Sequence, residues 1–228
     1  MKRILILQAG PDEWFRKAFA TAGVTAEISV VHAEESEPLP EFGAFGGIVI
    51  GGSPKSVCAP EPWMMPLAET ILGAAERGTL VLAVCFGHQL LATALGGTVV
   101  RSPKGREVGT VKIALTEYGR LDPILSALPP IAMVNSIHED IVTLPPSGAV
   151  ILAQNAHDSA QALRLSPTIL SVQFHPELDG QTLVDLVRTR AEQLSAEGLD
   201  PISLAQSVGD SPDGLTLLSA WGRHVEST

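Results

Sequence analysis

Hydrophobic residues in the first half of the chain fall into short continuous runs that alternate with stretches of helical periodicity. Runs that are apolar at nearly every position predict strands covered on both faces, here at residues 3–8, 27–32, 47–50 and 80–84. The periodic stretches predict helices over residues 13–22, 65–77 and 86–95. Strands separated by helices imply βαβ crossovers. We therefore expect an α/β fold with a mostly parallel central sheet flanked by helices.

The second half of the chain has a different texture. Short alternating runs at residues 109–115, 149–153, 160–165 and 169–174 predict added antiparallel strands, with a short helix near residues 121–127. A long amphipathic pattern over residues 179–197 predicts one helix that closes the main domain. Beyond it prolines interrupt the pattern. We therefore expect a main domain of residues 1–197 and a helical C-terminal appendage of residues 198–228 packed on it.

Composition narrows the class of protein. Of the 228 residues, 45% are hydrophobic and 18% charged, which is typical of a soluble globular enzyme. The net charge of −10 argues against a nucleic-acid partner, because phosphate binding needs clustered Lys and Arg. No apolar stretch approaches the ~18 residues of a membrane span, and no secretory signal is visible. Two cysteines without metal-ligand spacing, Cys58 and Cys85, favour a reducing compartment, so we expect a cytoplasmic protein.

Cys85 lies between the predicted strand ending at Val84 and the helical pattern that begins at Phe86. In such a strand-to-helix turn, backbone amides and the helix dipole favour the thiolate form of a cysteine. Gly87 suits a sharp turn, because a side chain there would crowd the returning helix. Position alone leaves two interpretations, a nucleophile or a buried structural cysteine.

His175 ends another apolar run, so it should emerge at the same sheet edge as Cys85. Residues i and i+2 of an extended segment point to one side, which allows His175 and Glu177 to meet, while Pro176 stiffens the link. A carboxylate on one imidazole nitrogen would turn the other nitrogen toward the thiol. Taken alone, the same residues also fit a surface loop histidine near a glutamate.

Gly51 and Gly52 directly follow the predicted strand at residues 47–50. Glycines at this end of a strand let backbone N–H groups approach a ligand closely. In an acyl-transfer site they would form an oxyanion hole, with the N–H groups of Gly52 and Phe86 directed at one oxygen. A plain glycine turn is the alternative. A phosphate loop is disfavoured, because the glycine spacings of the known phosphate-binding loops are absent.

Together the three motifs resemble those of the class I glutamine amidotransferase family, and they follow one another along the chain in the same order as in that family. They are Gly51-Gly52-Ser53, Cys85-Phe86-Gly87-His88-Gln89 and His175-Pro176-Glu177. The resemblance covers residues 1–195 and implies the family's flavodoxin-like fold. The cysteine motif and the segment His138-Glu139-Asp140, similar to the family's S-H-G-D, are closest to the amidotransferase domain of GMP synthase. No synthase domain follows, so we expect a stand-alone member.

The resemblance implies roles for further residues. Gln89, one helical turn after Cys85, would help to hold the substrate, as would His138, Glu139 and Asp140. His88 is expected to serve packing only. Two residues depart from the family pattern, since Ala83 and Glu139 each replace a glycine. Because the backbone near Glu139 helps to hold the amino-acid end of glutamine, this second change leaves specificity for glutamine open. No metal or cofactor is needed, and Lys104, Arg106 and Glu107 are expected in a solvated loop at the rim of the site.

Three functions are compatible with these residues. The first is a free-standing hydrolase of glutamine or a γ-glutamyl amide, since some stand-alone relatives resemble γ-glutamyl peptide hydrolases. The second is a glutaminase subunit that delivers ammonia to a separate synthase. The third is a catalytically silent binding protein on this fold, against which the three intact motifs argue.

Overall fold

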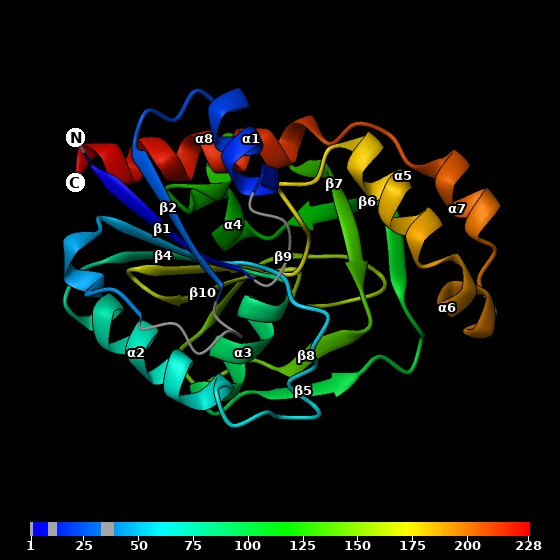
Figure 1. Ribbon diagram of the computed structural model, residues 1–228, viewed down its shortest axis with the longest axis horizontal. Coiled ribbons are helices and arrows are strands. Elements are labelled where there is room, and N and C mark those ends of the chain that lie inside the picture. The colour runs from blue at the N-terminus through cyan, green and yellow to red at the C-terminus, as the bar shows by residue number, and fades with distance from the viewer. Residues whose placement is uncertain (1, 9–12, 33–38) are drawn as a thin grey trace.

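A nine-stranded sheet forms the centre of the computed structural model, which describes residues 2–8, 13–32 and 39–228 (Figure 1). Its order is β2-β1-β3-β4-β11-β10-β9-β6-β7. The strands are β1 (Arg3–Gln8), β2 (Glu27–His32), β3 (Gly47–Ile50), β4 (Leu80–Val84), β6 (Glu107–Leu115), β7 (Ile131–His138), β9 (Val150–Gln154), β10 (Ala162–Ser166) and β11 (Ile169–Val172). Two further strands, β5 (Thr98–Arg101) and β8 (Asp140–Leu144), pair with each other in a small separate sheet.

The large sheet divides into a parallel and an antiparallel half, as the sequence predicts. Strand β11, expected among the antiparallel strands, is the exception, because it pairs in parallel with β4 and antiparallel only with β10. Strands β2, β1, β3, β4 and β11 pair in parallel. From β11 through β10, β9 and β6 to β7 every pairing is antiparallel. Strands β5, β7 and β8 were not among the predicted elements. In β7 the buried polar residues Asn135 and Ser136 interrupt the apolar run, which hides this strand from a hydrophobicity pattern.

Helices cover both faces of the sheet (Figure 1). Alternate residues of β1 supply the two cores: Ile4 and Ile6 pack with helices α1 (Glu13–Thr21) and α8 (Pro212–Ser227), and Leu5 and Leu7 pack with α2 (Met64–Glu76) and α3 (Phe86–Ala94). The short elements are η1 (Phe42–Ala44), α4 (Glu117–Leu121) and η2 (Leu125–Ala127). The single helix expected near residues 121–127 is therefore two separate turns.

The C-terminal part differs from the predicted single long helix. Residues 179–197 form two helices, α5 (Gly180–Thr189) and α6 (Ala191–Ala196), divided at Arg190. Helix α7 (Pro201–Ser207) and α8 follow. Helix α8 is an integral part of the core, because Leu217, Leu218 and Trp221 are buried in its largest cluster. Among the described residues, no helix has the length and apolar character that crossing a membrane requires.

Candidate active site

Cys85 lies in a strained turn between β4 and α3. Its φ of 51° is the only positive φ of a non-glycine residue in the described part of the chain. Such a conformation costs roughly 1–3 kcal/mol and is typical of functional turns. Gly87 is required two residues later, because a Cβ there would lie 2.6 Å from the carbonyl oxygen of Ile50. A side chain at Gly87 would therefore meet the end of the neighbouring strand β3.

His175 and Glu177 meet in the turn that follows β11. The Nδ1 atom of His175 lies 2.6 Å from Oε1 of Glu177, and both side chains are buried. The other carboxylate oxygen of Glu177 is buried without a hydrogen-bond partner among the described residues. This arrangement fixes the imidazole by one nitrogen, as the i and i+2 spacing predicts.

The electrostatic surroundings of His175 favour its charged form. Burial opposes protonation, but the negative charges of Glu177 and Cys85 and the hydrogen bonds to both outweigh it. Together they raise the pKa of His175 from 6.5 to about 10. The structure thus brings Cys85, His175 and Glu177 together, with an imidazole that carries a proton at neutral pH.

Gly52 lies against the ring of His175. A Cβ built on Gly52 would come within 2.7 Å of the Cε1 atom of His175. Only a residue without a side chain leaves the ring in its observed place. On the other side of the site, Phe86 begins helix α3, and the first N–H groups of a helix have no partner inside it. The predicted pair of backbone donors thus comes from Gly52 on the loop after β3 and Phe86 at the start of α3.

Asn135 holds the turn that carries His175, a role that the sequence did not reveal. Its carbonyl accepts a hydrogen bond from the His175 backbone at 2.8 Å, and its side-chain amide donates to the carbonyl of Leu178 at 2.9 Å. The side-chain oxygen Oδ1 of Asn135 accepts a hydrogen bond from the hydroxyl of Thr110 at 2.7 Å. The signal available in the sequence was a polar residue inside an otherwise apolar run.

Comparison with known proteins identifies the family. The family model described as "Glutamine amidotransferase class-I" matches residues 9–187, which is more than half of the chain. The chain belongs to this family. A GMP synthase [glutamine-hydrolyzing] from Aeropyrum pernix is 37% identical over 158 residues, 68% of this chain and 28% of that protein. The chain therefore matches much less than two thirds of that relative.

For other similar proteins the match includes a larger share of both chains. Gamma-glutamyl peptidase 4 of Arabidopsis thaliana is 26% identical over 201 residues, 82% of this chain and 80% of that protein. Among solved structures, a glutamine amidotransferase from Thermotoga maritima superposes with a TM-score of 0.79 at 20% identity, covering 99% of this chain and 98% of that one. These relatives are enzymes, and the last comparison supports the fold alone.

The four residues that the family resemblance suggests for substrate binding all form hydrogen bonds or ion pairs with other residues of the protein. Nε2 of Gln89 donates to the carbonyl of Asp140 at 2.9 Å and to Oε1 of Gln173 at 3.1 Å. Nδ1 of His138 also lies 3.0 Å from the Asp140 carbonyl. The carboxylate of Asp140 bonds to the hydroxyl of Ser56. These contacts tie helix α3 to the segment that joins β7 and β8.

Glu139 turns away from this segment toward two arginines. Its carboxylate lies 3.1 Å from Arg101 and 3.0 Å from Arg106. Arg106 in turn bonds to Glu197 at the end of α6, at 2.8 Å. With an exposed side-chain fraction of only 9%, Arg106 corrects the expectation of a solvated loop at this position. Its partners are distant in sequence, so hydropathy gave no sign of its burial.

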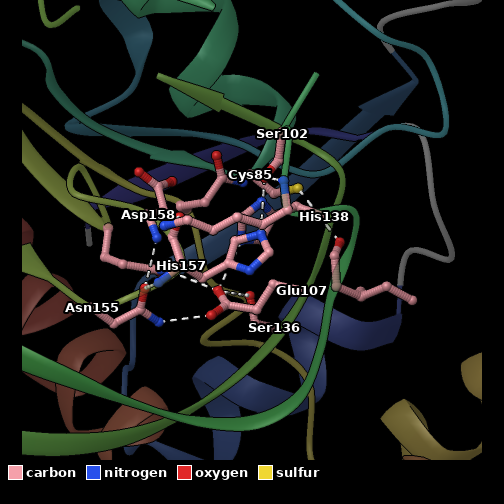
Figure 2. A network of polar contacts seen from close by, with 12 residues as sticks. Cys85, Ser102, Glu107, Ser136, His138, Asn155, His157 and Asp158 are labelled. Atoms are coloured by element: carbon pink, nitrogen blue, oxygen red, sulfur yellow. Dashed lines mark hydrogen bonds and ion pairs between the residues drawn. The ribbon is translucent and has the colours of Figure 1, made fainter. Parts of the chain in front are cut away.

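Glu107 is the centre of a buried polar network beside Cys85 (Figure 2). Its carboxylate accepts hydrogen bonds from Asn155 at 2.7 Å and Gln161 at 2.7 Å, and one of its oxygens lies 3.0 Å from Nε2 of His138. Burial acts to raise the pKa of Glu107, but these hydrogen bonds and the charge of His138 lower it overall. The expectation of a solvated Glu107 is therefore wrong.

Two histidines outside the triad motifs have distinct environments. His88 is fully buried, with Nδ1 2.9 Å from the hydroxyl of Ser171, and burial together with His138 lowers its pKa to about 3. It is a neutral packing residue, as expected. His157 packs edge-on against His138 at 5.7 Å between ring centres, so it is part of the wall of the network and not a free surface residue.

Proposed function

We propose that this chain hydrolyses the side-chain amide of glutamine or of a γ-glutamyl compound through a γ-glutamyl thioester on Cys85. The products would be glutamate and either ammonia or an amine. The observation that carries the proposal is the meeting of the Cys85 thiol, the His175 imidazole and the Glu177 carboxylate at one edge of the sheet. Membership of the class I family and the similarity to a γ-glutamyl peptidase support the same chemistry.

In the first half of the proposed reaction, the sulfur of Cys85 attacks the γ-carbonyl carbon. The carbonyl oxygen becomes an oxyanion, which the N–H groups of Gly52 and Phe86 stabilise. His175 then gives its proton to the leaving nitrogen, so that the C–N bond breaks and the thioester remains. Glu177 keeps the imidazole oriented and stabilises its positive charge.

In the second half, His175 accepts a proton from water, and the resulting hydroxide attacks the thioester carbon. The same two N–H groups stabilise the second oxyanion. The C–S bond then breaks and glutamate leaves, so that the free Cys85 sulfur again lies beside a protonated His175, as at the start. Over the cycle His175 gives one proton to the leaving amine and regains one from water, so the net reaction consumes one water molecule.

Release of glutamate from glutamine and from γ-glutamyl dipeptides tests the proposal. We expect turnover by the purified chain, and its loss by at least about 10³-fold in Cys85→Ala, because the covalent step disappears. Cys58→Ala is the matched control, since Cys58 is exposed and lies in a loop. Activity that survives Cys85→Ala would show that the cysteine is not the nucleophile.

The similarity to GMP synthase favours a second function. In this function the chain would supply ammonia to a separate synthase partner. In that case glutamine should be hydrolysed only after the synthase is added, and γ-glutamyl dipeptides should not be substrates. If neither condition gives turnover while the protein is folded, the third possibility of a silent binding protein replaces both.

A further inference from the structure

Arg190, at the break between α5 and α6, is a half-buried cation that has no partner among the residues the structure describes. Four arginines of the described residues are partly buried: Arg3, Arg106, Arg164 and Arg190. The first three lie within ion-pair distance of a carboxylate. Arg190 forms no hydrogen bond through its side chain and no ion pair with any residue that the structure describes. A guanidinium removed from water without compensation is costly, and such a group is usually paired.

The helix places Arg190 on the same face as buried residues of α5 and α6. Helical hydrogen bonds run from Arg190 to Leu186 and from Leu194 to Arg190, so the periodicity continues across the break. Arg190 therefore shares a face with Leu183, Val187 and Leu194, which pack against Ile137. The carbonyl oxygen of Ile137 lies 4.0 Å from the sulfur of Cys85. The cluster on this helix face thus includes a residue whose backbone lies next to the thiol.

The charged groups around Arg190 leave its guanidinium unneutralised. Burial lowers the pKa of Arg190, and the positive charge of Arg106 lowers it further, while the negative charges of Cys85 and Glu197 oppose this. Glu197 is already committed to Arg106: its Oε2 accepts from Nε at 2.8 Å and its Oε1 from a terminal nitrogen at 2.9 Å. The carboxylate whose charge acts on Arg190 is therefore already held by Arg106.

We propose that Arg190 binds a carboxylate of the substrate beside Cys85. The identity of that substrate rests on the proposed function. Every γ-glutamyl substrate carries an α-carboxylate, and a γ-glutamyl peptide carries a second one on its leaving group. A planar guanidinium that is only partly solvated suits either, because it binds a carboxylate with two parallel hydrogen bonds. Arg190 would thereby determine which γ-glutamyl compounds the site accepts.

Alkylation of Cys85 tests this without any hydrolysis assay. Iodoacetate and iodoacetamide have the same size and the same reaction, but only iodoacetate carries a carboxylate. The ratio of their rates cancels any change in the reactivity of the thiol and isolates the attraction for the anion. We expect the ratio of iodoacetate to iodoacetamide rates to fall at least about threefold in Arg190→Gln, and to recover in Arg190→Lys. All variants carry Cys58→Ser, so that only Cys85 reacts.

Arg188→Gln is the matched control, because Arg188 lies on the same helix but is exposed and paired with Asp185. Its ratio should not change. If Arg190→Gln leaves the ratio unchanged, or lowers both rates equally, Arg190 does not bind a carboxylate and the proposal is wrong. Circular dichroism confirms that each variant is folded. Because the readout is alkylation, this outcome is independent of whether the chain hydrolyses γ-glutamyl compounds.

Two substrates then distinguish the carboxylates. In Arg190→Gln, a loss of kcat/KM for a γ-glutamyl amino acid but not for a γ-glutamyl alkylamide assigns Arg190 to the leaving-group carboxylate. An equal loss for both, together with the altered alkylation ratio, assigns it to the α-carboxylate. No loss for either substrate would overturn the proposed part in substrate recognition.

Discussion

Replacing Gly52 by alanine should displace the His175 ring and remove most activity. The added Cβ would lie 2.7 Å from Cε1 of His175, which is 0.7 Å short of the 3.4 Å at which ordinary contact begins. The ring cannot move freely, because its Nδ1 atom is held at 2.6 Å by Glu177 and its backbone N–H bonds to Asn135. Either the ring or the loop after β3 must therefore shift by a large part of an ångström.

A displacement of this size in a reacting group costs on the order of 100-fold in rate, which is about 2.7 kcal/mol of transition-state free energy. We expect kcat/KM for glutamate release to fall by that factor in Gly52→Ala. Most of this loss should appear as a lower kcat, with little change in KM. Gly43→Ala is the matched control, because a Cβ at Gly43 would meet no atom within 4 Å.

Thermal unfolding separates a local effect from loss of the fold. The Gly52→Ala protein should keep its cooperative transition, since only one side chain at the site is pressed. If this folded variant retains activity within about threefold of the wild type, the position of the His175 ring is not important for the reaction. The assignment of His175 as the base would then fail.

Three further outcomes follow from the contacts described above. The pKa of His175 is raised from 6.5 to about 10, so its contribution to the free energy of unfolding is fully present below about pH 6.5 and declines as the pH rises toward 10. Urea unfolding should show this decline in the wild type and a smaller one in Glu177→Gln. Equal declines in the two proteins would contradict the pairing of His175 with Glu177. Asp179→Ala should lower the free energy of unfolding by about 1 kcal/mol, because Asp179 caps α5 by accepting a hydrogen bond from the Thr182 N–H at 2.7 Å. Asp179→Ser should retain most of this stabilisation, because serine can also cap a helix. Equal losses for the two variants in denaturant titrations would exclude the cap. Trp221→Ala should lower the free energy of unfolding by about 3–5 kcal/mol, because this side chain is buried. A chain ending at residue 197 should fail to fold. A cooperative unfolding transition in that shortened chain would refute the packing of α8 on the core.

Local sequence determined the first four strands of the parallel half and pointed to the candidate site residues, whereas the parallel place of β11 was not predicted. The bounds of β1 to β4 agree with the predicted runs, because a buried strand must be apolar at nearly every position. Local position made Cys85 and the pair His175 and Glu177 candidates, but each alone left a structural interpretation open, and only their combination with Gly51-Gly52 favoured catalysis. The class I family was evident from these motifs, and the family comparison confirms it.

Only the tertiary structure decided which polar residues are buried together. Strand β7 was not predicted, since Asn135 breaks its apolar pattern while supporting the His175 turn. Glu107 and Arg106 look like rim residues in the sequence but are enclosed by partners up to 91 residues away. Hydropathy describes a residue and its near neighbours, whereas the burial of a charge depends on partners that the fold brings from elsewhere. Arg190 illustrates the limit, because only the folded chain shows that no carboxylate of the described ranges pairs with it.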